Sequence, residues 1–140
     1  MIALDASALL AFLFAEKGHE QVAQQLDDAC MSAVNLAEVA SRFARDGHDP
    51  RALCRRIVDS PIEIVPFLAG DAEIAAVLAP ITKDYGLSLG DRACLALAMS
   101  RQIDALTADA MWASLKLPVT VRLIGPTMIR PATIRPAVKR

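Results

Sequence analysis

Four acidic residues stand at similar places along the chain, each just after a short apolar segment or within the first turns of a predicted helix. They are Asp5, Glu38, Asp91 and Asp109. In open α/β sheets, ligands bind beyond the carboxyl ends of the strands, where helix N-termini also converge, so these acids could gather at one edge. Carboxylates held close together repel one another. The pattern therefore predicts a site for a divalent cation.

The chemistry that such a site favours is hydrolysis of a phosphodiester bond. Mg²⁺ prefers hard oxygen ligands and usually takes one or two carboxylates, with water or substrate phosphate completing its shell. Four acids exceed what one ion needs, which leaves a carboxylate to orient water or to hold a second ion. Two ions about 4 Å apart can stabilise both the attacking and the leaving oxygen of the displacement.

Each acid also has a purely structural interpretation. Asp5 and Asp109 could cap the helices that follow them. Glu38 could pair with Arg42 one helical turn later, and Asp91 could complete a capping box. For any one acid alone the structural interpretation is favoured, whereas the joint pattern of four favours the cation site.

Helical and strand patterns alternate from end to end. Predicted strands lie at residues 2–5, 30–32, 62–65, 105–107 and 119–123, and predicted helices lie between residue 6 and a break at 17–18, then at 19–28, 34–45, 50–59, 71–83, 89–101 and 110–115. Short strands separated by helices predict an α/β fold, in which a parallel sheet carries helices on both faces.

The composition predicts one domain, residues 1–124, in the cytoplasm. The chain has 140 residues, of which 54% are hydrophobic, yet no apolar stretch reaches the roughly 20 residues that span a membrane. The first residues lack the basic region of a secretory signal. Three cysteines without a CxxC pair exclude a disulfide framework or zinc knuckle and are typical of reduced thiols.

Residues 125–140 differ from the rest of the chain. A weak repeat, Ile-Arg-Pro-Ala, places a proline every fifth residue, which blocks helix and sheet and predicts an extended or disordered tail. A solvated tail is favoured over an arm that binds RNA or a partner. The tail carries four basic residues and no acid, so residues 1–124 carry a net charge of −5.

An acidic body is unusual for a nucleic-acid binder. Basic residues that could nevertheless contact phosphates are clustered, with a solvated helix face or a partner-binding surface as the favoured alternative. They are Arg42, Arg45 and Arg92, together with Arg51, Arg55 and Arg56.

Four motifs in order carry a resemblance to a known family. They are Ile2-Ala3-Leu4-Asp5-Ala6-Ser7, then Asn35-Leu36-Ala37-Glu38-Val39, then Leu87 to Ala98 (LSLGDRACLALA), then Leu106-Thr107-Ala108-Asp109-Ala110-Met111-Trp112. The sequence resembles PIN-domain ribonucleases, and among them the VapC-type toxins of bacterial VapBC toxin–antitoxin pairs. Each motif is weak alone, whereas all four in this order are specific, and they cover roughly residues 1–124.

The resemblance implies a role for each motif. Asp5, Glu38, Asp91 and Asp109 would be the catalytic and metal-binding acids, for Mg²⁺ or Mn²⁺. Ser7 and Thr107 would orient carboxylates or water, and Asn35 would support Glu38; ordinary capping or packing is an equal alternative for the two hydroxyls. A central, mostly parallel sheet of about five strands, a homodimer and a small VapB-type antitoxin covering the site are also implied.

The function expected from the sequence is thus a metal-dependent endoribonuclease acting as a toxin, with a catalytically retired PIN-like binding module as the alternative. Haloacid-dehalogenase-like phosphatases would need an Asp where Ser7 stands, and response-regulator receivers would need a paired acid and a late lysine. His19 and His48 are expected at the surface, and Trp112 and Phe43 are expected to pack rather than stack on bases.

Overall fold

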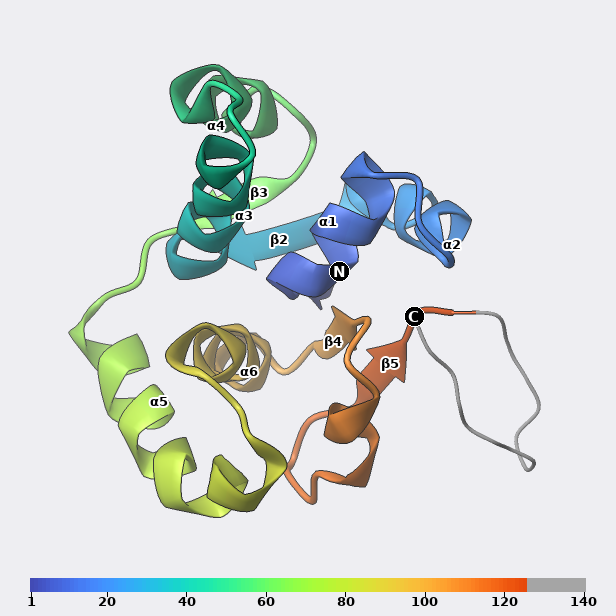
Figure 1. The fold of residues 1–140 in the computed structure, drawn as a ribbon. Helices are drawn as coiled ribbons and strands as arrows, with labels where there is room; N and C mark the ends of the chain where they lie inside the picture. The colour runs from blue at the N-terminus through green and yellow to red at the C-terminus, as the bar shows by residue number, and fades with distance from the viewer. Residues whose placement is uncertain (126–140) are drawn as a thin grey trace.

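A five-stranded parallel sheet in the order β3-β2-β1-β4-β5 forms the centre of the molecule (Figure 1). The computed structural model describes residues 1–125, so the tail predicted at 125–140 lies outside the described residues except for Gly125. The strands are β1 (Ile2–Leu4), β2 (Ala29–Ser32), β3 (Glu63–Val65), β4 (Asp104–Thr107) and β5 (Val121–Leu123). The prediction of an α/β fold with a parallel central sheet is confirmed.

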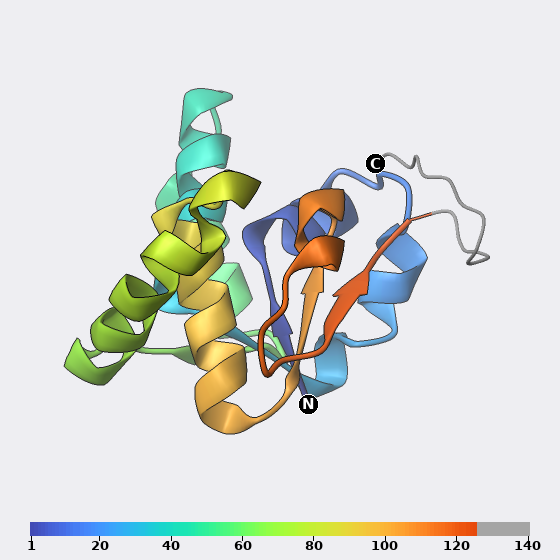
Figure 2. The same ribbon diagram turned by 90° about the horizontal axis from the view of Figure 1, so that it is seen from below.

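Helices connect successive strands and cover both faces of the sheet. They are α1 (Ala6–Leu13), α2 (His19–Ala23), α3 (Ala33–Arg45), α4 (Pro50–Val58), α5 (Ala69–Thr82) and α6 (Leu89–Arg101), with 3₁₀ turns at Leu26–Asp28, Lys83–Tyr85 and Ala110–Ser114. Figure 2 shows α5 and α6 on one side of the sheet and α1 and α2 on the other. No helix within residues 1–125 has the length and apolar character needed to cross a membrane.

Alternate side chains of the central strand build two cores. Ile2 and Leu4 of β1 pack in one core with α1, α3 and α4. Ala3, which points to the opposite face, packs in a second core with α6 and the fully buried Trp112. The prediction that Trp112 is a packing residue is confirmed.

The strand order creates a switch point between β1 and β4. From β1 the chain moves outward through β2 and β3, then returns across the sheet to β4 and β5. Leu4 is paired with Leu106, and the backbone N–H of Asp5 donates to the Leu106 carbonyl at 2.9 Å. The segments that follow β1 and β4 therefore start side by side, where open α/β sheets form their ligand sites.

Three predicted elements are shorter than expected by two residues or more. The helix predicted from residue 6 to a break at 17–18 ends at Leu13. The helix predicted at 19–28 ends at Ala23 and resumes as a 3₁₀ turn, because Val22 is the only buried residue of α2 and little apolar contact extends it. The strand predicted at 119–123 begins at Val121. The Thr120 carbonyl just before it still accepts the Ala105 N–H at 2.9 Å.

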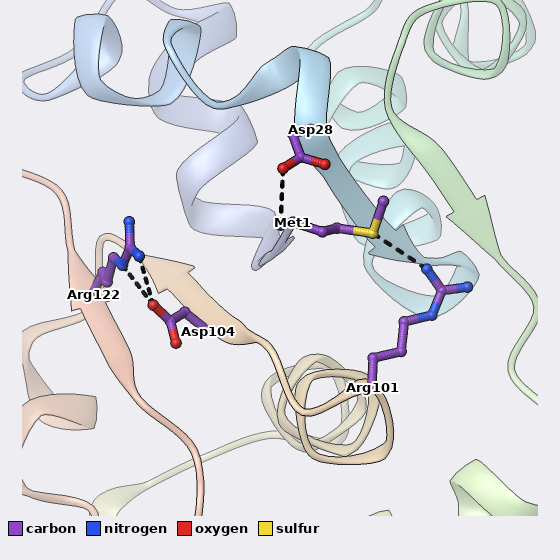
Figure 3. A network of polar contacts seen from close by, with 5 residues as sticks. All are labelled: Met1, Asp28, Arg101, Asp104 and Arg122. Atoms are coloured by element: carbon purple, nitrogen blue, oxygen red, sulfur yellow. Dashed lines mark hydrogen bonds and ion pairs between the residues drawn. The ribbon is translucent and has the colours of Figure 1, made fainter.

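Ion pairs hold the opposite, amino-terminal ends of the strands (Figure 3). The Met1 amine lies 2.8 Å from Asp28, and Arg122 lies 2.7 Å from Asp104. Arg101, at the end of α6, donates two 2.8 Å hydrogen bonds to Glu63 at the start of β3. Because these groups are partly exposed, each pair contributes about 0–1 kcal/mol to stability.

Candidate active site

Asp5 is a buried carboxylate at the carboxyl end of β1. It is 3% exposed, and its position is fixed from both sides because the strand before it and α1 after it are packed in the core. Its side chain makes no capping hydrogen bond to α1. The interpretation of Asp5 as a simple helix cap is therefore wrong, because the carboxylate accepts hydrogen bonds from two side chains, Ser7 of α1 and Thr107 of β4, instead.

Two hydroxyls hold the Asp5 carboxylate. Ser7 Oγ donates to Asp5 Oδ2 at 2.6 Å, and Thr107 Oγ1, from the end of β4, donates to the same oxygen at 2.9 Å. Each hydroxyl in turn accepts a backbone N–H from the segment after β4: Ser7 from Ala108 and Thr107 from Asp109. The two hydroxyl oxygens also lie 3.1 Å apart, so Ser7, Thr107 and Asp5 Oδ2 form one hydrogen-bonded cluster that the two backbone N–H groups hold in place.

Glu38 lies one turn into α3 and is half-buried. Its Oε1 accepts a 2.9 Å hydrogen bond from Asn35 Nδ2, which also donates to the Gly90 carbonyl at 2.9 Å. The alternative pairing of Glu38 with Arg42 is wrong, because Arg42 Nε lies 3.2 Å from Asp46 Oδ2 and the Arg42 guanidinium covers the ring of Phe14. Glu38 thus faces α6 rather than its own helix surface.

Asp91 and Asp109 both act at helix starts. Asp91 Oδ2 accepts the Ser88 N–H at 2.8 Å, while Ser88 Oγ accepts the Asp91 N–H, which confirms the predicted capping box. Asp109 Oδ1 accepts the Met111 N–H at 3.0 Å and so caps the 3₁₀ turn, as predicted. Each cap uses one carboxylate oxygen, so capping does not exclude a second role.

The charges of the four acids act on one another. Burial raises the pKa of Asp5 from 3.8 to about 7, against the Ser7 and Thr107 hydrogen bonds, and the charges of Asp91 and Glu38 raise it further. Burial also raises the pKa of Glu38, which the charge of Asp91 reinforces. The pKa of Asp91 is raised by burial and by Asp109, against the hydrogen bonds from Ser88. Residues from four separate elements therefore share one electrostatic environment.

None of the four acids has a basic partner within ion-pair distance among residues 1–125. Each has one oxygen hydrogen-bonded by the protein, and its second oxygen receives no hydrogen bond from that part of the chain. Free carboxylate oxygens in a region of excess negative charge suit a hard divalent cation, so the donor set fits Mg²⁺ or Mn²⁺.

The described residues contain no ready-made cage for a metal ion. No three acidic, histidine or cysteine side chains within residues 1–125 stand close enough together to hold one. Mg²⁺ sites commonly take one or two carboxylates and leave the other positions to water or phosphate.

The arginines predicted to contact phosphate differ in whether their side chains already contact other protein groups. Arg45 is exposed, Arg42 is engaged with Asp46 and Phe14, and Arg92 Nη1 donates to the Ala75 carbonyl at 2.8 Å, which joins α6 to α5. His48 is exposed beside Phe43, and His19, the first residue of α2, lies 3.3 Å from Glu20. Neither histidine has a described hydrogen bond or ion pair to any of the four acids.

Gly90 is the residue of this region that the sequence did not single out. A Cβ atom placed on it would overlap the Glu38 carboxylate. The sequence does contain a signal for it. Gly90 stands directly before Asp91 in the first turn of a predicted helix, where the backbone conformation does not require a glycine.

A family model described as PIN domain matches residues 2–116. No curated protein matches the sequence.

Solved structures of toxin–antitoxin proteins share the fold. VapC20 of Mycobacterium tuberculosis, a sarcin-ricin loop cleaving toxin, is 16% identical with a TM-score of 0.68, over 86% of this chain and 99% of that chain. VapBC2 of Rickettsia felis, bound to a DNA fragment from its promoter, is 14% identical with a TM-score of 0.67, over 89% and 99%. FitAcB of Neisseria gonorrhoeae is 24% identical with a TM-score of 0.62, over 86% and 96%.

The raised pKa of Asp5 predicts how pH and metal change stability. Between pH 4 and about pH 7 the folded metal-free protein retains an Asp5 proton that the unfolded chain has released. The free energy of unfolding therefore falls as pH rises through this window. At pH 7 and above, Mn²⁺ should restore stability by neutralising the acids, with about 2.7 kcal/mol expected when its concentration is 100 times Kd. Thermal melts with EDTA or Mn²⁺ measure both effects.

Asp5→Asn is the matched control, since it keeps the shape of the side chain and removes the titration. Its melting temperature should vary less between pH 4 and pH 7, and its response to Mn²⁺ should be smaller. A wild-type protein whose melting curve ignores Mn²⁺ at pH 7.5 would count against the cation site.

Proposed function

Since residues 2–116 match the family model, this chain belongs to the PIN domain family, and we propose that it is a Mg²⁺- or Mn²⁺-dependent endoribonuclease, the toxin of a toxin–antitoxin pair. The observation that carries the proposal is the set of four acids, Asp5, Glu38, Asp91 and Asp109. The charges of Asp91 and Glu38 raise the pKa of Asp5, that of Asp91 raises the pKa of Glu38, and that of Asp109 raises the pKa of Asp91. Among the described residues, no basic group lies within ion-pair distance of any of the four acids.

Such an arrangement weakens the metal-free protein, because ionised carboxylates that are partly desolvated and unpaired are unfavourable. A scaffold that only bound RNA or protein would gain nothing from it. A catalyst gains, because the same charges attract the cation that phosphodiester hydrolysis uses. This contrast favours the nuclease over the retired binding module.

The free oxygens of the four acids would hold the cation and the attacking water. A bound divalent cation supplies Lewis-acid activation of the water and stabilises charge on the leaving oxygen. Ser7 and Thr107 fix Asp5 through hydrogen bonds to one oxygen, so the other oxygen keeps its orientation. The water oxygen would bond to phosphorus while one of the four carboxylates accepts the water proton. The bond from phosphorus to the leaving nucleoside oxygen would break, and that oxygen would take a proton from solvent, without a covalent enzyme intermediate.

RNA would approach along α3. Arg42 lies one turn beyond Glu38, and Arg45 about one further turn along the helix. Arg45 is exposed and forms no ion pair with residues 1–125, so it is the better phosphate contact of the two. Arg92 follows Asp91 directly, and its positive charge lowers the Asp91 pKa. Phosphate contacts of this kind position RNA without reading its sequence.

The partner we propose is a small antitoxin of the VapB type. This rests on the four-motif resemblance and on the likeness of the fold to the Rickettsia felis and Mycobacterium tuberculosis toxin–antitoxin proteins. The free thiols Cys30 and Cys94, which are buried in the described part of the chain, agree with action in the cytoplasm.

Cleavage of RNA tests the activity directly. We expect purified protein to cut a pool of tRNA and rRNA with Mg²⁺ or Mn²⁺, and to lose this activity with EDTA. Asp91→Asn keeps an acceptor for the Ser88 N–H, so the helix start survives while a cation ligand is lost, and cleavage should fall at least about 100-fold. Gel and sequencing analysis of the products measures this.

The control for the cleavage assay is Asp71→Asn, at the corresponding cap of α5. Asp71 Oδ2 accepts the Leu68 N–H at 2.8 Å, as Asp91 accepts that of Ser88, but Asp71 lies outside the four acids. It should cut like the wild type. If the folded wild-type protein binds Mn²⁺ but cuts no RNA, the catalytically retired binding module would be favoured over the nuclease.

Growth of a bacterial host tests the toxin role. Expression of the chain alone should arrest growth, and co-expression of the small gene adjacent to its own should relieve the arrest. Asp5→Asn should be tolerated at the same protein level. Normal growth at high levels of soluble, RNA-cleaving protein would remove the toxin role while leaving the nuclease intact.

A homodimer is the assembly that the resemblance implies, and α5 offers the surface. Val77 and Ile81, one turn apart on its outer face, are 61% and 50% exposed. We expect light scattering to give twice the chain mass of 15.0 kDa, and Val77→Glu to give the monomer. Val58→Glu, at a position 59% exposed on α4, should leave the dimer intact. A monomeric wild type contradicts this assembly.

A further inference from the structure

Gly90 is buried at the second position of α6, directly before Asp91. Its backbone is not among the glycines with positive φ, so any residue could adopt its conformation. Glycine in a helix costs about 0.5–1 kcal/mol relative to alanine. Space is what requires a glycine here, since a Cβ atom would overlap the carboxylate carbon and both oxygens of Glu38.

The Gly90 carbonyl makes a second contact with the same acid through Asn35. Asn35 Nδ2 donates at 2.9 Å to Glu38 Oε1 and at 2.9 Å to the Gly90 carbonyl. The reversed amide would set its oxygen against two acceptors, so this orientation is the only favourable one. It leaves Asn35 Oδ1 buried without a hydrogen bond among the described residues, a cost of about 1–3 kcal/mol.

These contacts fix a carboxylate of α3 against the start of α6. The two helices pack together, and the first turn of α6 carries Asp91. A glycine inside a helix and an unpaired amide oxygen both weaken folding, and both accompany the placement of Glu38 against the residue before Asp91. Together, the Gly90 and Asn35 contacts fix the position of Glu38 relative to Asp91.

We propose that Gly90 is a positioning residue, whose missing side chain and whose carbonyl, bound by Asn35, seat the Glu38 carboxylate beside Asp91 for joint binding of a divalent cation. This rests on the proposed function. A methyl group at position 90 pushes Glu38 away. Since the displaced atoms are the far end of a flexible side chain, the fold tolerates the change while the cation site does not.

The test compares two glycines at matched positions. Gly70 is the second residue of α5 and precedes Asp71, as Gly90 is the second residue of α6 and precedes Asp91, but a Cβ on Gly70 meets nothing within 4 Å. Mn²⁺ affinity is measured by electron paramagnetic resonance of the free ion. Gly90→Ala should weaken it about tenfold or more, the range for residues that support metal ligands, while melting near the wild-type temperature without metal. Gly70→Ala should bind Mn²⁺ like the wild type.

A double variant makes the test independent of how Gly90→Ala folds. Glu38→Asp withdraws the carboxylate by one methylene and leaves room for the alanine. Glu38→Asp and Gly90→Ala combined should therefore bind Mn²⁺ as tightly as Glu38→Asp alone. A further tenfold loss in the double variant would show that Gly90 does not act through Glu38 and would overturn the proposal.

The possible results distinguish a failure of the Gly90 proposal from a failure of the proposed nuclease function. If wild type binds Mn²⁺ and cuts RNA but Gly90→Ala binds Mn²⁺ equally well, the positioning role fails and the nuclease stands. If wild type binds no Mn²⁺, both the cation site and the role of Gly90 fail.

Discussion

The burial of the Asp5 carboxylate is the constraint on which the rest of the site depends. The residue follows β1 at the centre of the sheet, where both cores exclude water. An ionised carboxylate there costs several kcal/mol unless polar groups meet it. Ser7 and Thr107 supply those groups, and the segment that leads to Asp109 donates a backbone N–H to each of them. One buried charge thereby ties the ends of β1 and β4 together.

The other acids show how one residue serves both fold and site. Asp91 and Asp109 each accept a backbone N–H at a helix start, which orients the carboxylate with one oxygen and leaves the other free. Glu38 lies inside α3, where the backbone N–H groups are already paired. No backbone N–H is therefore free to bind its carboxylate, and the Asn35 side chain donates the hydrogen bond instead.

Much of the architecture was predictable because it depends on local patterns. Alternating short strands and helices sufficed for the parallel sheet, and Ser88 with Asp91 sufficed for a capping box. The structural alternative for Asp5 was wrong because one of its partners, Thr107, is distant in sequence. The alternative for Glu38 was wrong because Arg42 contacts Asp46 and Phe14 instead. Whether the four acids bind metal stays a prediction. The tight approach of Gly90 to Glu38 depends on how α3 packs on α6, which periodicity does not encode.

The acids at the two ends of the sheet differ in whether they have a basic partner among the described residues. At the amino ends, Asp28 and Asp104 each meet a cation (Figure 3), and Glu63 pairs with Arg101, so this fold readily pairs its strand-end acids. At the carboxyl ends, four acids share one region without such a partner among residues 1–125. Arg92 stands next to Asp91 in the chain yet bonds the Ala75 carbonyl. A sequence under pressure only for stability would place a cation there, so the unpaired charge favours a ligand that supplies it.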